Sequence, residues 1–146
     1  MRRFTIGAAA VVAVSWAGFA MAQGGVTTAE EYAKLMKSTG QAFGATNKAI
    51  ASGAYADART QLTNVRQNFM TLQAFWTARN RDDAVGIVKD ALTRIDALDQ
   101  MLAAPTVDQM AAQATAKQVQ GSCGACHKLY REGDNDTGFR FIPGVL

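Results

Sequence analysis

Seven apolar residues in the middle of the chain are separated by alternating steps of three and four. They are Tyr55, Ala58, Leu62, Val65, Phe69, Leu72 and Trp76. This spacing places all seven on one face of a helix, as in a helix of a left-handed bundle. No segment of the sequence shows the period of two that is typical of a half-buried strand. The pattern therefore predicts helices that pack against one another.

The segments on either side carry the start and stop signals of further helices. Thr28 and Glu31 form a capping box that opens a first helix, which Ser52-Gly53 ends. A third helix is expected to start near Asn80 and to end before Pro105. Its predicted apolar face comprises Val85, Val88, Leu92, Ile95 and Leu102, with Leu98 beside them.

A fourth helix is predicted to open at a second capping box, Thr106 with Gln109, and to break at residues 133–136. Four helices joined by short connections predict an all-α fold, an up-down-up-down antiparallel four-helix bundle. The fourth helix has few bulky apolar side chains, with Ala111, Ala114 and Val119 among the small ones. Another group is therefore expected to supply apolar volume beside it.

The first 22 residues have the pattern of a cleaved Sec-type signal peptide. Arg2 and Arg3 precede an uncharged apolar run over residues 4–19, and Ala20-Met21-Ala22 fits the small-x-small cleavage site. An uncleaved anchor helix is the alternative, although the run is short for a membrane span. We expect a mature periplasmic chain of 124 residues, with a bundle domain over 23–132, a tail over 133–146 and no membrane span.

The charge of the expected mature chain is close to neutral. Loss of Arg2 and Arg3 leaves 13 basic and 12 acidic residues, a net charge of about +1. No basic stripe interleaved with aromatic residues is present, so nucleic acid is not an expected partner.

The pentapeptide Cys123-Gly124-Ala125-Cys126-His127 carries the clearest chemical signal. In an exported protein, C-x-x-C-H indicates covalent attachment of a c-type haem. Both thiols lie on about one helical turn, so each can reach one vinyl group of the same porphyrin. His127 is the sole histidine and is the predicted proximal ligand. The expected cofactor is one haem c near the C-terminal end of the last helix.

Three other interpretations of the motif fit the sequence less well. A thioredoxin-like redox pair needs a preceding strand, whereas residues 110–120 are rich in Ala and Gln and indicate helix. A structural zinc site needs four protein ligands, and two cysteines with one histidine supply three. A disulfide would close so short a loop that it would hardly constrain the unfolded chain.

Met36 is the candidate for the opposite face of the iron. Met36 and Met70 are the methionines expected at the height of the motif, because the other two of the mature chain fall toward the far end of the bundle. Gly40 and Gly44 share the side of the helix that carries Met36, which leaves a stripe without bulk for a flat macrocycle. In the alternative, Met36 fills a gap in the core. Met70 is expected to pack as core.

Two segments resemble a known family. Residues 123–131, C-G-A-C-H-K-L-Y-R, are similar to the C-x-x-C-H-x-x-Y-R ending of the class II c-type cytochromes, the cytochrome c′ family. Residues 32–40, Y-A-K-L-M-K-S-T-G, resemble the stretch Y-R-Q-x-x-M-K-x-x-G in the first helix of that family. The resemblance implies a four-helix bundle with its haem near one end. Members with Met at the position of Met36 are low-spin and six-coordinate and carry electrons. Members with an apolar residue there are five-coordinate and bind gases.

The sequence also departs from the family pattern. The first-helix arginine that lines the haem pocket in the family is absent, and Tyr32 or Ala33 stands near its position. Phe75 and Trp76 place two aromatic rings at the expected haem end. Arg131, one helical turn beyond His127, could pair with a haem propionate, and a solvated helix-end arginine is the alternative. The tail is expected to fold back over the haem edge or the helix ends, or else to dock on a partner.

We expect an exported monohaem cytochrome that carries single electrons between redox partner proteins, with a His127/Met36-ligated low-spin iron. The alternatives are a five-coordinate protein that binds nitric oxide or carbon monoxide and a haem subunit of a larger respiratory complex. A homodimer is a further possibility, since dimers are common in the resembling family. No enzymatic activity is expected, because the sequence has no second histidine and no evident acid–base pair beside an open coordination site.

Overall fold

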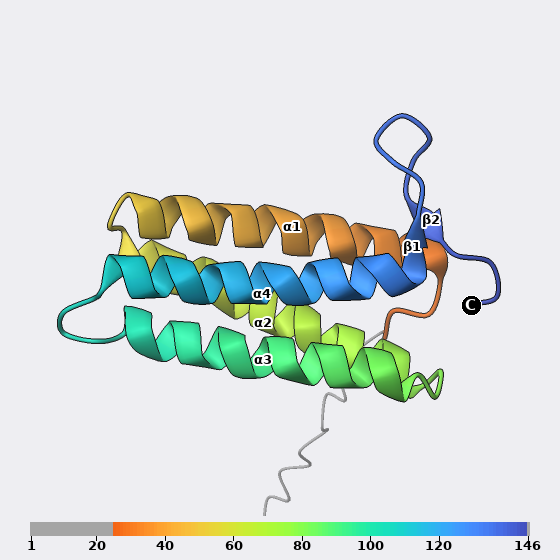
Figure 1. Ribbon diagram of the computed structural model, residues 1–146, viewed down its shortest axis with the longest axis horizontal. Helices are drawn as coiled ribbons and strands as arrows, with labels where there is room; N and C mark the ends of the chain where they lie inside the picture. The colour runs from red at the N-terminus through yellow and green to blue at the C-terminus, as the bar shows by residue number, and fades with distance from the viewer. Residues whose placement is uncertain (1–24, 146) are drawn as a thin grey trace, which may run out of the picture.

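The computed structural model describes residues 25–145, which fold as four long helices and a short hairpin (Figure 1). The elements are α1 (Ala29–Ala51), α2 (Tyr55–Thr77), α3 (Asp82–Leu102), α4 (Gln109–Tyr130), β1 (Arg131–Glu132) and β2 (Arg140–Phe141). The predicted signal peptide, residues 1–22, lies outside the described residues. None of the helices described here has the length and apolar character of a membrane span.

The four helices run antiparallel to their neighbours in the chain and pack as a four-helix bundle (Figure 1). The side-chain amide of Gln109 joins the last helix of the bundle to the first. Its Nε2 donates to the carbonyls of Ile50 at 2.6 Å and Ala51 at 3.0 Å. These carbonyls end α1, where no further turn of helix satisfies them. The start of α4 therefore lies against the end of α1, and the predicted all-α bundle is confirmed.

The predicted start and stop of α1 are confirmed. The Glu31 amide donates to Thr28 Oγ1 at 3.2 Å, and Glu31 Oε2 accepts from the Thr28 amide at 3.0 Å. Hydrogen bonds from the backbone amides of Thr27 and Thr28 lower the pKa of Glu31 to about 2. Ser52 caps the C-terminus, and Gly53 adopts a φ of 77° that favours glycine.

The predicted starts of α3 and α4 were wrong in detail. Asp108 caps α4 by accepting from the Ala111 amide, whereas Gln109, the expected partner of Thr106, instead binds the end of α1. At α3 the cap position is Arg81, whose side chain makes no capping bond. Asn80 lies in the preceding turn with a φ of 54°, a region that Asn tolerates better than most residues.

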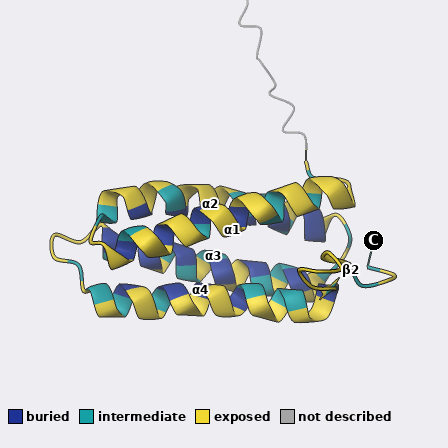
Figure 2. Cartoon of the chain, turned by 90° about the horizontal axis from the view of Figure 1, so that it is seen from above, coloured by how far each residue is buried: buried dark blue, intermediate teal, exposed yellow. Residues whose placement is uncertain are grey.

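The buried face of α2 matches the predicted stripe, with Tyr55 half-buried and Phe75 added. On α3 the predicted stripe was displaced. The buried residues are Ala84, Val88, Ala91, Ile95, Leu98 and Leu102, and Leu98 lies in the row instead of beside it. Val85 and Leu92 are only half-buried. Figure 2 shows the buried residues along the inward faces of the helices.

The end of the chain forms an antiparallel hairpin in which Arg131 pairs with Phe141 and Glu132 with Arg140. The boundary predicted after residue 132 therefore falls at the end of β1, inside the hairpin. The expectation that Arg131 continues the helix was wrong, since its φ of −124° and ψ of 136° are extended. Gly133 adopts a φ of 86°, and a Cβ there would lie 2.0 Å from the Gly138 carbonyl oxygen.

Candidate functional site

The pentapeptide occupies the last two turns of α4. Cys123, Cys126 and His127 are all half-buried, on the side of the helix that buries Val119 and Tyr130. Steps of three and four residues keep them on this face. The two thiols and the imidazole are thus held on one side of a single helix and directed toward the bundle.

Met36 lies at the same height as Cys123. The contact between Gln109 and Ile50 fixes the register of α4 against α1. Cys123 is 14 residues beyond Gln109, and Met36 is 14 residues before Ile50, so both lie about 21 Å along antiparallel helices. The same reasoning places Tyr32 level with His127. Met36 is half-buried and packs against the core.

The side of α1 that carries Met36 is open. Ser38 and Ala42 line the groove between α1 and α2, so they mark the edge of the buried face of α1 that is turned toward α2. At a rotation of 100° per residue, Met36 lies at the opposite edge of this buried face, toward α4. A Cβ added to Gly40 or Gly44 would meet no atom within 4 Å. In addition, α1 and α4 contact each other less extensively than do helices joined by a turn.

The other three methionines of the expected mature chain lie elsewhere. Met70 is 52% exposed, so the expectation that it packs as core was wrong, and its sulfur accepts from Arg66 Nη1 at 3.2 Å. Met101 accepts from Thr115 Oγ1, and Met110 is 81% exposed.

Burial keeps the motif side chains uncharged at neutral pH. Burial raises the pKa of the Cys123 thiol. Burial, together with the nearby Cys123 and Asp83, raises the pKa of the Cys126 thiol to about 11. Burial and then the Arg131 charge lower the pKa of His127. The site therefore presents two neutral thiols and a neutral imidazole whose lone pair is free to bind a metal.

These observations count against the other interpretations of the motif. A thiolate-based redox pair has a lowered cysteine pKa and a preceding strand, whereas here the pKa is raised and a helix precedes the motif. Cys123 and Cys126 are not joined to each other. Within residues 25–145, no three His, Cys, Asp or Glu side chains are grouped to hold a metal ion, as a zinc site would require.

Five aromatic side chains from four elements surround the end of the bundle where the motif lies. They are Tyr32, Phe75, Trp76, Tyr130 and Phe141. Trp76 is fully buried, with its ring centroid 4.5 Å from that of Tyr130 and 5.8 Å from that of Tyr32. The sequence predicted Phe75 and Trp76 at this end. The tail that was expected to fold back over the haem edge or the helix ends includes Phe141, which the structure places in this cluster.

Two buried donors in this cluster have no hydrogen-bond partner among the described residues, the Trp76 indole N–H and the Tyr130 hydroxyl. Burial and the nearby Asp83 carboxylate raise the pKa of Tyr130 to about 12. The Tyr130 hydroxyl therefore stays protonated at neutral pH, with the Asp83 carboxylate close by.

Arg131 does not project along α4 as predicted. It is exposed, and its guanidinium carbon lies 4.0 Å from the centroid of the Phe139 ring. Its charge still reaches His127, whose pKa it lowers.

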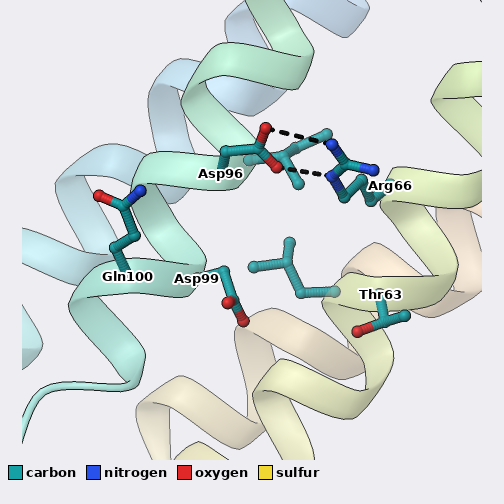
Figure 3. Close-up of a pocket in the computed structure, with 7 residues that line it drawn as sticks. Thr63, Arg66, Asp96, Asp99 and Gln100 are labelled. Atoms are coloured by element: carbon teal, nitrogen blue, oxygen red, sulfur yellow. Dashed lines mark hydrogen bonds and ion pairs between the residues drawn. The ribbon is translucent and has the colours of Figure 1, made fainter.

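A hollow of about 320 Å³ lies between α2 and α3, away from the motif (Figure 3). Arg66 and Asp96 span it with an ion pair of 2.6 Å, and Leu62 and Ile95 lie at its base. It contains none of the predicted site residues.

Comparisons with protein-family models, curated proteins and solved structures gave no match to this chain.

Proposed function

We propose that this protein is an exported monohaem c-type cytochrome of the class II type, which carries single electrons between redox partner proteins. The observation that carries the proposal is the donor set at one end of the bundle. Two neutral thiols and a neutral imidazole share one face of α4, and a methionine sulfur on α1 lies level with them.

The residues at this end fit a haem. Cys123 and Cys126 are unlinked and half-buried, so both thiols would be available to hold a haem through thioether bonds. Each S–H would add across one vinyl group, with the sulfur on one carbon and the hydrogen on the other. The open stripe beside Met36 suits a flat group.

The side chains would then hold and tune the cofactor, whose iron supplies the one-electron couple when bound. His127 provides a neutral nitrogen, and Met36 a soft neutral sulfur that raises the reduction potential relative to a second nitrogen ligand. Arg131 is the proposed propionate partner, a role that would compete with its stacking on Phe139. The aromatic cluster would exclude water from this end of the bundle.

Covalent attachment is tested by the mass of the mature protein after expression in a host with a c-type haem attachment system. We expect the wild-type chain to keep one haem after denaturation and Cys123→Ala/Cys126→Ala to keep none. Ser122→Ala, a buried neighbour on the same helix, should retain it. A wild-type mature chain with no added mass would refute the proposal.

A further inference from the structure

The C-terminal hairpin is fastened to the end of the bundle at several points. The Ile142 amide donates to the Tyr130 carbonyl at 3.1 Å, and Arg81 Nη2 donates to the Gly144 carbonyl at 3.1 Å. Arg140 and Glu132 pair across the hairpin at 2.9 Å, and Val145 packs against the core. This segment is therefore part of the fold of the domain.

Phe141 is the side chain that the hairpin places against the aromatic cluster. Its ring centroid lies 4.7 Å from that of Tyr32, 5.9 Å from that of Trp76 and 6.2 Å from that of Phe75, with the Phe75 ring nearly parallel at 11°. Phe141 thus covers three aromatic residues from two helices.

The cluster under Phe141 adjoins the last turn of the motif. Tyr32 is level with His127, and Cys126 lies close enough to raise the pKa of Tyr32. Tyr130, which contacts Trp76, is three residues beyond His127. The rings that Phe141 contacts therefore lie beside the last turn of the motif.

We infer that Phe141 is a positioning residue that closes the outer wall of the proposed haem site and thereby raises the reduction potential of the iron. This inference rests on the proposed function. A haem iron loses positive charge on reduction, so removing water from its surroundings favours the reduced state. The hairpin would then be a tuning element of this cytochrome, built on the segment that follows α4.

The covering role is tested without haem. Trp76 is the single tryptophan of the expected mature chain, and its fluorescence can be quenched by acrylamide. In the haem-free background Cys123→Ala/Cys126→Ala, we expect Phe141→Ala to increase the quenching constant at least twofold. Phe141→Leu should restore most of the protection, and Asn135→Ala, at an exposed residue of the hairpin turn, should leave it near the parent value. Unchanged quenching in Phe141→Ala would overturn the inference and leave haem attachment unaffected.

The tuning role is tested on the haem-loaded protein by redox titration. Phe141→Ala should have a lower reduction potential than wild type at unchanged haem content. Phe141→Leu should lie between the two, and Asn135→Ala close to wild type. A potential for Phe141→Ala equal to that of wild type, alongside increased quenching, would show that the hairpin covers the cluster without tuning the iron and would also overturn the inference. Absence of haem from all variants would refute the proposed function instead. The quenching experiment would still measure how far Phe141 shields Trp76 from solvent.

Discussion

Met36 and Cys123 lie at one height on two facing helices, and neither residue reveals this relation from its local sequence. The relation depends on Gln109, which fixes the register of α4 against α1. Once the register is known, Met36 is the methionine whose height and half-burial suit a ligand opposite His127. In the proposed haem site, this one sulfur would distinguish a saturated iron from an open one.

Met36→Leu should therefore create an open coordination position with little effect on folding, because Met and Leu have similar volumes. We expect this variant to bind carbon monoxide when reduced and to have a lower reduction potential than wild type. Carbon monoxide titration followed by absorbance measures the first effect. Met70→Leu, at an exposed methionine of α2, is the matched control and should resemble wild type. Equal spectra for Met36→Leu and wild type would show that Met36 packs against the core without binding the iron.

Glu31→Gln should change how stability depends on acid pH. The pKa of Glu31 is lowered from 4.5 to about 2 in the folded state, so its stabilisation is complete above about pH 4.5 and is lost as the pH falls toward 2. Thermal denaturation at pH 7 should show a melting temperature a few degrees lower, ~2–5 °C. The difference from wild type should shrink between pH 4.5 and 2. Glu30→Gln keeps both capping bonds, and an equal loss in that variant would contradict the assignment.

The candidate site residues on α4 stand out in the sequence because the covalent attachment proposed for them requires this spacing. The environment of these residues could not, since it depends on side chains from α1, α2 and the hairpin. Arg131 shows the difference. A step of four from His127 predicted a shared helical face, but α4 ends at Tyr130 and the backbone turns into a strand. The exposure of Met70 was missed for a similar reason, because its helix is amphipathic and Phe69 takes the inward position.

At the scale of elements, the hairpin is the least expected feature. Its residues include Gly133, Asp134 and Gly138, which indicate a turn, and the strands on either side are only two residues long. Strands so short have almost no periodicity to detect. Their pairing depends on anchoring to the bundle through Tyr130 and Phe141. By contrast, α2 shows six turns of one repeating pattern, and its buried face was predicted almost completely.

Gly133→Ala should disrupt the hairpin. The residue has a φ of 86°, and the added Cβ would lie 2.0 Å from a backbone oxygen of Gly138, which cannot move aside as a side chain would. We expect a loss of about 1–3 kcal/mol in the free energy of unfolding, measured by urea denaturation. In the haem-free background, acrylamide quenching of Trp76 should increase as for Phe141→Ala.

Gly121→Ala is the matched control for this change. Gly121 lies inside α4 with open space around it, so alanine should be neutral or slightly stabilising there. If Gly133→Ala were as stable as Gly121→Ala, the hairpin would not have the close backbone approach described above.

At the scale of the whole molecule, the bundle has a packed core along its length and chemically distinct ends. Ile50, Leu98 and Leu102 are buried toward the end where α1 meets the start of α4, while the aromatic cluster and the motif occupy the other end. This arrangement separates the residues that stabilise the fold from those proposed to hold the haem. The effects of substitutions at the two ends on the free energy of unfolding should therefore be nearly additive.

Leu98→Ala tests this separation. Leu98 is fully buried, so the variant should lose about 2–5 kcal/mol in the free energy of unfolding by urea denaturation. Its visible spectrum and reduction potential should match those of wild type. Leu129→Ala, at a leucine that is 50% exposed, should change stability by less than about 0.5 kcal/mol. A shifted potential in Leu98→Ala would contradict the division between the two ends.

The most direct test of the account is the absorption spectrum of the mature protein, oxidised and reduced, with and without carbon monoxide. Ligation by His127 and Met36 predicts a sharp low-spin reduced spectrum, a weak sulfur-to-iron band in the oxidised protein and no change with carbon monoxide. A broad high-spin spectrum that carbon monoxide shifts at once would contradict the electron-carrier assignment and indicate gas binding at an open iron. A protein without any haem absorbance would contradict the account as a whole.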